Sequence, residues 1–222
     1  MRNFKIGFFL FFLFLAVSYQ IQAADFVSVQ SGSYGSATTW NPSGIPAAGD
    51  NVTIAAGHLV TGASVTVNQL TVNGEFQHTS GNLNVNGTFT VNAGGVLNGD
   101  SQINLNGTIA IVNDGTVSPT TVFVGGTTHD ISGAGTWSPT TFRFFGTGNT
   151  TFLSNITISA GTFRKENTGT LVLGAQTLTI NGGNYHGGQN RLARRNDCYR
   201  FDFQRSARNC FRHNNRQFDY NE

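Results

Sequence analysis

Apolar and polar residues alternate in short bursts between positions 51 and 180. Each burst contains two apolar residues separated by one residue that is mostly Thr, Asn or another polar residue. A period of two places one side of a strand in a core and the other side in water, so each burst predicts a short β-strand. The apolar pairs are Val52/Ile54, Val65/Val67, Leu70/Val72, Leu83/Val85, Phe89/Val91, Ile103/Leu105, Ile109/Ile111, Val122/Val124, Phe142/Phe144, Ile156/Ile158, Leu171/Leu173 and Leu178/Ile180. Asn-Gly, Gly-Gly and Asp-Gly turns separate the bursts, so we predict an all-β protein.

The bursts also repeat along the chain. Residues 83–91 align with residues 103–111, and residues 70–76 form an earlier, less regular copy. A period of this length is typical of a solenoid, in which each coil buries its apolar side only against neighbouring coils. We therefore predict a right-handed parallel β-helix (solenoid) of roughly 20-residue coils. A β-sandwich, which also has short and evenly spaced strands, is the alternative. In the solenoid, the Asn residues before Gly are expected at corners, bonded to the same Asn one coil further on.

Residues 25–50 differ from the repeats and are expected to form an N-terminal cap segment. The first coil of a solenoid exposes apolar side chains and an unpaired strand edge, so it needs a cover. Phe26, Tyr34 and Trp40 supply large apolar side chains for that cover. Two prolines in the same segment stiffen a loop that cannot extend a ladder.

The segment from Trp40 to Gly57 reads Trp…Gly-x-Pro…Gly-Asp-x-Val-x-Ile-x-x-Gly. It resembles the opening of bacterial secreted adhesin-like parallel β-helix repeat proteins, and part of the G8 type of extracellular glycine-rich domain. The resemblance implies a loop over the first coil and a Gly-Asp turn that leads into the first strand of the stack. Asp50 is accordingly expected to end a turn.

The first residues of the chain have the pattern of a secretion signal. A short basic start precedes an apolar run over residues 6–17, and Ala23 and Ala24 follow as small residues at a possible cleavage point. A transmembrane helix needs about 20 apolar residues, so this run is too short to span a bilayer. We predict that residues 1–24 are a cleavable signal peptide, that the protein is secreted or at the outer cell surface, and that it has no transmembrane segment.

Charge divides the remaining chain into two parts. Residues 25–185 hold three basic and seven acidic residues, for a net charge of −4, and residues 186–222 hold eight Arg and four acids, for a net charge of +4. We therefore predict a β-helix repeat domain over residues 51–185, followed by a basic Arg/Phe/Asn-rich tail over residues 186–222.

The tail contains no Val, Ile or Thr, which are abundant in the repeats. Three interpretations are open: a basic appendage that binds acidic polymers, a small element closed by a disulfide between Cys198 and Cys210, or a disordered or frameshifted segment. The abrupt change in composition favours the third. No nucleic-acid-binding motif is present, so no nucleic acid is expected as a partner.

Candidate catalytic groups are few. Asp100, Asp114 and Asp130 do not recur at the interval of one coil, and the first two lie in turn sequences. The His129-Asp130 pair is expected in a solvated loop. No nucleophile or metal motif is present. We therefore predict a protein without catalytic residues, metal or cofactor. The alternative is a polysaccharide lyase or glycoside hydrolase of the β-helix type, which would need paired carboxylates.

The outer pattern of Thr, Asn and Ser suits weak, multivalent contact with extracellular polysaccharide or a host or cell surface. The expected function is therefore a non-catalytic structural or adhesion module, as a fragment of a larger protein. Trp137, Phe142 and Phe144, together with Phe145, are candidate ligand-binding residues that would stack on sugar rings. Packing in the core explains most of these side chains equally well, and it is the interpretation that we favour. The sequence does not indicate the oligomeric state.

Overall fold

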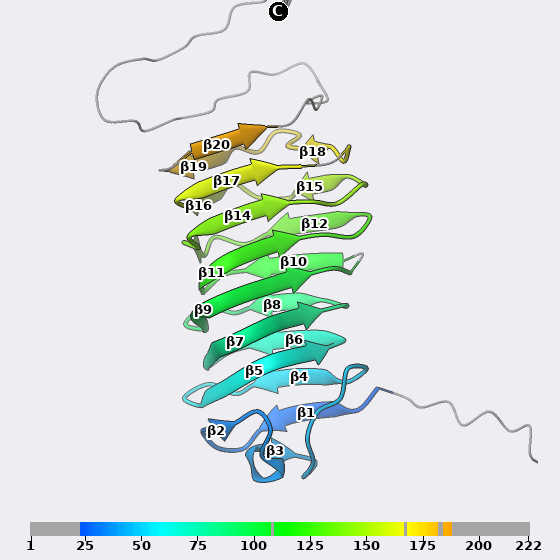
Figure 1. Ribbon diagram of the computed structural model, residues 1–222, viewed down its shortest axis with the longest axis vertical. Coiled ribbons are helices and arrows are strands. Elements are labelled where there is room, and N and C mark those ends of the chain that lie inside the picture. Colours follow the sequence, from blue (N-terminus) through cyan, green and yellow to red (C-terminus); the bar gives the residue numbers. More distant parts are fainter. Residues whose placement is uncertain (1–22, 108, 167, 182–183, 188–222) are drawn as a thin grey trace, which may run out of the picture.

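The computed structural model describes residues 23–107, 109–166, 168–181 and 184–187, and these residues form a β-solenoid of about six turns. As the chain climbs in Figure 1, the nearer strands run to the right and the more distant strands run to the left, so the coil is right-handed. The predicted fold class is confirmed. The predicted signal peptide, except its last two residues, and nearly all of the tail, including Cys198 and Cys210, lie outside the described residues.

The first sheet takes one strand from each coil. Its order from the N-terminal end is β3 (Trp40–Asn41), β1 (Asp25–Ser28), β4 (Asn51–Ile54), β6 (Gln69–Val72), β8 (Phe89–Val91), β10 (Ile109–Asn113), β12 (His129–Ser132), β15 (Thr150–Phe152) and β18 (Leu171–Val172). All neighbours in this sheet are parallel except the terminal pair of β1 and β3. This arrangement excludes the antiparallel sandwich for the described residues.

The second sheet begins with β2 (Gly32–Ser33) and the long strands β5 (Leu59–Val67), β7 (Glu75–Val85), β9 (Val96–Leu105) and β11 (Thr116–Val124). Register irregularities divide each long strand into two segments. In later coils two separate strands replace the long one: β13 (Thr136–Trp137) with β14 (Thr141–Phe144), β16 (Ile156–Ser159) with β17 (Thr162–Lys165), and β19 (Leu178–Asn181) with β20 (Asn184–Gly187). The second sheet therefore presents two outward surfaces.

The predicted apolar pairs fall in these strands, with Leu173 one residue beyond β18. Apart from Ile109, their side chains are buried, and they stack coil on coil. One such column holds Val67, Val85, Leu105, Val124 and Phe144, all in register and buried. Burial of about 1.5–3 kcal/mol per large apolar side chain, repeated along the axis, supplies the main stabilisation of the stack.

The predicted repeat is confirmed in the second sheet, where Leu83 pairs with Ile103. In the first sheet, however, Phe89 pairs with Ile111 and not with its repeat equivalent Ile109. The step along the chain from Leu105 to Ile111 is two residues longer than the step from Val85 to Phe89, the two positions with which they pair. The number of residues per coil therefore differs from the interval of the sequence repeat. The length of the connection between strands decides which residues pair across neighbouring coils.

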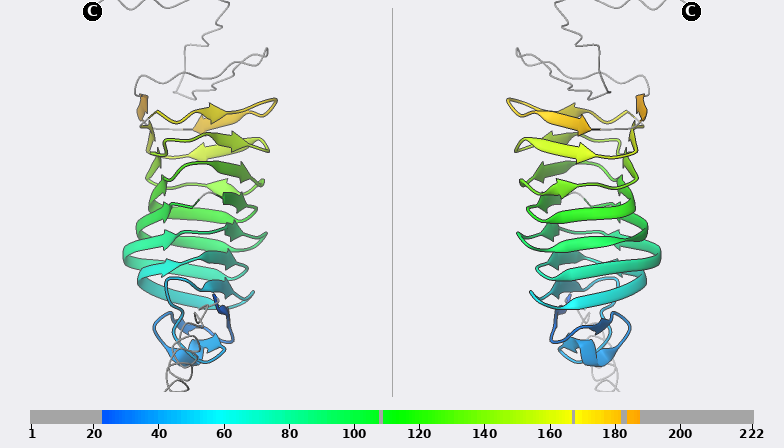
Figure 2. Two further views of the ribbon diagram at one scale, coloured as in Figure 1. Left: turned by 90° about the vertical axis from the view of Figure 1, so that its right-hand side faces the viewer. Right: turned by 90° about the vertical axis from the view of Figure 1, so that its left-hand side faces the viewer.

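The cap forms as expected. Phe26, Tyr34 and Trp40 are buried. The Trp40 indole Nε1 donates to the Tyr34 carbonyl at 2.8 Å, and the two rings meet edge to face at 5.3 Å. The short 3₁₀ helix η1 (Ala37–Thr39) precedes β3, which pairs with the outer edge of β1. Figure 2 shows this segment at the N-terminal end of the stacked coils. The parallel stack thus begins at β1, inside the segment 25–50.

Asp50 ends a turn, as the resemblance implied. One carboxylate oxygen accepts from the Ala24 amide at 2.9 Å, and the other accepts from the Ala47 amide at 2.7 Å. Asp50 therefore fastens the loop of the cap to the first strand of the stack.

Asparagine side chains bond between coils. Asn92 donates to Asn73, which precedes a Gly, at 2.6 Å, and Asn104 donates to Asn84 at 2.7 Å. Each amide bonds to the equivalent Asn one coil away, but Asn84, Asn92 and Asn104 do not precede a Gly, and Asn84 and Asn104 lie within strands. These bonds are therefore not the ladder between Asn-Gly corners that the sequence predicted. Among the described residues, no helix is long and apolar enough to cross a membrane.

Candidate functional site

The aromatic residues suggested as ligand contacts lie in the core. Trp137, Phe142 and Phe144 are each at most 2% exposed. Phe142 contacts the Trp137 ring at 5.5 Å, the Phe144 ring at 5.1 Å and the Phe163 ring at 6.2 Å. A ligand on the outer surface cannot stack on these rings. The structure therefore places all three in core packing, the other interpretation of the same residues.

The neighbouring residue lies on the opposite side of the strand. Phe145 is 42% exposed, because successive side chains of an extended chain alternate between the two faces of a sheet. Its ring lies 5.1 Å from the ring of Phe123, which also points outward. An aromatic pair is therefore accessible on the surface, one residue away from the buried aromatic cluster.

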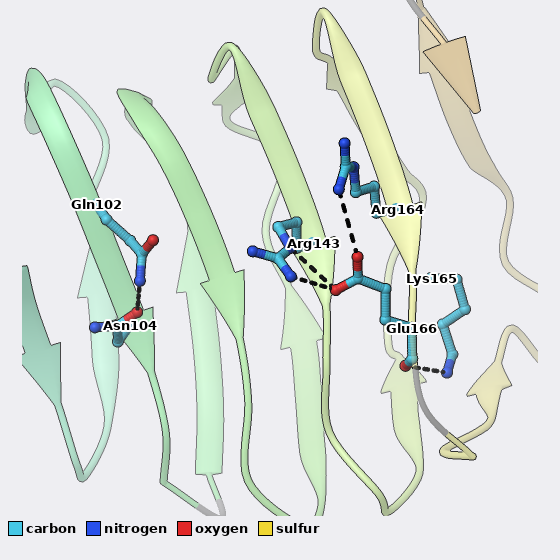
Figure 3. Close-up of polar contacts among 6 residues, drawn as sticks. All are labelled: Gln102, Asn104, Arg143, Arg164, Lys165 and Glu166. Carbon is cyan, nitrogen blue, oxygen red and sulfur yellow. Dashed lines mark hydrogen bonds and ion pairs between the residues drawn. The ribbon is translucent and has the colours of Figure 1, made fainter. Parts of the chain in front are cut away.

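Phe123 belongs to a column of outward residues in one register. From the N-terminal end, the column runs through Asn84 of β7, Asn104 of β9, Phe123 of β11, Arg143 of β14 and Arg164 of β17. We call this outward side of the five strands, including the flanking Gln102, Phe145 and Glu166, the ladder face. Figure 3 shows part of it, with successive strands lying side by side.

The N-terminal half of the ladder face consists of linked amides. Gln102 donates to the Asn104 side-chain oxygen, Asn104 donates to Asn84, and Asn84 donates to the Thr66 hydroxyl at 3.2 Å. An amide has two N–H donors and an oxygen with two lone pairs, so these bonds leave hydrogen-bonding capacity for solvent or a ligand on the partly exposed Asn84 and Gln102, whereas Asn104 is buried at 8% exposure.

The C-terminal half carries charge. Arg143 donates from Nε and Nη2 to one oxygen of Glu166, at 3.1 and 2.5 Å. Arg164 Nη1 lies 3.7 Å from the other oxygen of the same carboxylate. The Arg143 guanidinium carbon also lies 5.1 Å from the centre of the Phe123 ring, within the range of a cation–π contact. Figure 3 shows Glu166 between the two arginines.

The third basic residue of this region faces the interior. Lys165 occupies the inward column above Phe144, and it is 6% exposed. Its ammonium donates to the Glu166 backbone carbonyl at 3.3 Å, and burial lowers its pKa. The surface of the ladder face therefore carries two guanidinium groups and one carboxylate.

His129 corrects a sequence-based expectation. It does not lie in a solvated loop but in β12, where it points inward and is buried. Its Nε2 bonds to the Gly125 carbonyl, and its Nδ1 has no hydrogen-bond partner among the described residues. Burial lowers the pKa of this imidazole, while the Gly125 carbonyl and Asp130 oppose the shift. A polar residue can take an inward position here because a neighbouring carbonyl supplies a partner.

His78 of β7 is also fully buried, and its ring stacks on Phe76 at 6.4 Å. Burial lowers its pKa, and the backbone of Ser80 opposes this shift. Neither ring nitrogen has a hydrogen bond of normal geometry to any described residue. Neither buried histidine reaches the surface, so neither is placed to exchange a proton with an external substrate.

The remaining titratable groups lie at turns or away from the ladder face. Asp114 accepts from the Ala134 amide of the next coil at 3.0 Å. No group of three or more His, Cys, Asp or Glu side chains in the described residues could hold a metal ion. A shallow depression lies between the cap and β5, lined by residues such as Tyr34, Pro46 and Ser64 but by no carboxylate, imidazole or amine. Burial raises the pKa of the Tyr34 phenol well above its usual range.

The sequence contained a signal for the charged pair that sequence reasoning did not use. Arg143 and Arg164 are separated by about one coil of chain, so the repeat length already places them on neighbouring strands. The outward aromatic Phe123 precedes Arg143 by the same interval of about one coil. Comparison of the chain with protein-family models, curated proteins and solved structures finds no significant match.

Proposed function

We propose that this chain is a non-catalytic module of a secreted or surface-located protein that binds extracellular polysaccharide through the ladder face. One observation carries the proposal: the ladder face brings Phe123 and Phe145 together with Arg143, in line with the amides of Asn84 and Asn104. Sequence reasoning suggested glycan contact through aromatic residues, and of the residues suggested there Phe145 lies on this face, where Phe123 joins it.

Each group on this face suits a sugar. Amide groups donate to and accept from hydroxyls, and guanidinium groups donate to them. An exposed aromatic ring offers a flat apolar surface against which the C–H face of a sugar ring can pack. Successive strands lie about 4.8 Å apart, so the groups repeat along the axis at a spacing comparable with one pyranose unit. A polymer lying along the axis would contact several strands at once, and individually weak contacts would add.

The non-catalytic part of the proposal is supported by the positions of the possible catalysts. His78, His129 and Lys165 lie in the interior, and Asp50 and Asp114 bind backbone amides at turns. The Glu166 carboxylate of the ladder face is engaged by two arginines. The described residues therefore offer no acid–base pair at the surface on which a bound polymer would lie.

Retention of the purified chain on insoluble polysaccharides tests the proposal. The chain is expected to sediment with at least one member of a panel of cellulose, chitin, xylan and de-esterified pectin, and the Phe145→Ala variant is expected to sediment less. Thr157→Ala is the matched control, because Thr157 is exposed on β16, outside the ladder face. Absence of retention on the whole panel would refute the proposal, and retention that only the control variant reduces would place binding on a different surface.

A further inference from the structure

Two arginines on the ladder face differ in how far their donors are used. Arg143 directs two nitrogens to Glu166, at hydrogen-bonding distances, and its side chain is 30% exposed. Arg164 has its ion pair with Glu166 at 3.7 Å, beyond hydrogen-bonding distance, and its side chain is 43% exposed. Its Nε is buried without a hydrogen-bond partner among the described residues. The buried Nε is out of reach of an external ligand, but the Nη groups, on a side chain that is 43% exposed, have donor capacity that their neighbours in the described chain do not satisfy.

Charge at this position is also incompletely balanced. Arg143 and Arg164 are directly opposite each other on neighbouring strands, where like charges repel, and one carboxylate serves both. In the column that precedes them, Asn84, Asn104 and Phe123 are uncharged, although β7 and β9 also carry Glu75 and Asp100 outside this column. Within the column, one positive charge is thus left over beside the exposed Phe145 ring.

We propose that Arg164 binds the carboxylate of a uronic acid unit, so that the polysaccharide taken by the ladder face is a polyuronate. This inference rests on the proposed polysaccharide-binding function and names its ligand class. A carboxylate matches the planar donor fork of a guanidinium group, and the site already shows this chemistry in the way Glu166 binds Arg143. The uncharged face of the next sugar would pack against the Phe123 and Phe145 rings.

Glu166 acts in this arrangement as an internal competitor. Its carboxylate occupies the side of both guanidinium groups that a uronate would approach. Neutralising it would remove a repulsive charge and release the donors of Arg143. Loss of Arg164 should therefore weaken binding and loss of the Glu166 charge should strengthen it, although both residues belong to one ion-pair cluster.

Affinity electrophoresis of the full chain through gels containing polygalacturonate, in the presence of EDTA, tests the inference, with neutral galactan as the comparison. We expect polygalacturonate to retard the unaltered chain more strongly than galactan does. Arg164→Gln should bind polygalacturonate with about fivefold weaker affinity. Arg164→Lys should lose only part of the affinity, because lysine keeps the positive charge but not the planar donor fork. Glu166→Gln should bind at least about twofold more tightly. Thr157→Glu lowers the net charge by the same amount as Arg164→Gln, but at an exposed position of β16 outside the ladder face. This variant should bind polygalacturonate as the unaltered chain does.

The outcomes separate this inference from the proposed function. Equal retardation by galactan and polygalacturonate, unchanged in Arg164→Gln, would overturn the uronate assignment and leave polysaccharide binding intact. No retardation by any polysaccharide would overturn both. Stronger retardation by dextran sulfate than by polygalacturonate would replace the carboxylate with a sulfate ester and so overturn the assignment. Thermal unfolding of every variant checks that the fold is kept, and Glu166→Gln tests for a gain that misfolding cannot produce.

Discussion

Replacing Phe142 with alanine should destabilise the protein without directly affecting the outer surface. Phe142 is 1% exposed and pairs in register with Val122 on one side and Phe163 on the other. Its ring contacts those of Trp137, Phe144 and Phe163. The substitution would leave a cavity between two coils that the neighbouring strands cannot close without breaking their ladder.

The expected loss follows from the area that the ring buries. An aromatic side chain buries about 150–250 Å², which at about 25 cal/mol per Å² corresponds to about 4–6 kcal/mol. Alanine keeps part of that contribution, so the expected loss is about 3–5 kcal/mol, as for other buried Phe→Ala changes. The outward Phe145→Ala change should cost less than about 1 kcal/mol, because that ring is already 42% exposed.

Urea unfolding followed by far-ultraviolet circular dichroism measures both losses. In a solenoid each coil contacts only its neighbours, so the Phe142→Ala loss should be local. Hydrogen exchange should accordingly accelerate most in β14, β17 and the strands next to them. Polysaccharide retention, measured on folded protein, should fall for Phe145→Ala but not for Phe142→Ala.

Two results would refute this reasoning. Equal destabilisation by the two substitutions would show that Phe142 and Phe145 do not face opposite sides of the strand. A Phe142→Ala protein that loses less than about 1 kcal/mol but no longer binds polysaccharide would restore the surface role considered from the sequence.

The buried polar groups and the cap lead to three further predictions. Because burial lowers the pKa values of His78 and His129, the unfolded chain takes up protons first as the pH falls below about 6.5, and stability should fall by up to about 1.4 kcal/mol per pH unit for each histidine. Urea midpoints between pH 7.5 and 5 measure this loss, which a His78→Gln/His129→Gln protein should show less. Lys165→Met should raise the free energy of unfolding by about 1–3 kcal/mol, since it removes a charge from the core, and thermal unfolding at pH 7 measures the gain. Asp50→Ala should lower that free energy by about 1–3 kcal/mol, because two backbone amides lose their acceptor, and proteolysis of the cap measures the loss.

Each of these predictions has a contrary outcome. A pH dependence that the double histidine substitution leaves unchanged would assign the acid sensitivity to carboxylates. A lower thermal midpoint for Lys165→Met would show that the ammonium contributes more through its contacts than it costs by burial. Asp50→Asn keeps one acceptor oxygen and should lie between Asp50→Ala and the unaltered protein, and an Asn variant as labile as the Ala variant would contradict the capping role.

The strand content of the solenoid was readable from the sequence because apolar residues two apart report directly on one buried side. The near-copy of residues 83–91 at residues 103–111 also predicted the stacking of β7 on β9. The cap was readable because its large aromatics occur where the repeat pattern is absent. These features depend on local periodicity and composition, which no distant contact can change.

Three of the strands that the apolar pairs did not predict share a physical cause. β12, β15 and β17 each place a polar residue at an inward position, respectively His129, Thr150 and Lys165. An inward polar residue breaks the apolar pair on which the strand prediction depended. Pairing with the coils on both sides nevertheless holds these segments in the sheet, so the tertiary ladder overrides the local pattern.

The sequence by itself determined that this chain is all-β, that its strands stack at a regular interval along the chain and that an aromatic cap precedes them. The apolar pair Phe142/Phe144 already predicted a buried side, and only the tertiary structure decided that Phe145 meets Phe123 on the outward one. It also decided that Arg143 and Arg164 share one carboxylate. The reason is that coil length varies at the corners, and a change of one residue there moves every following side chain to the opposite face.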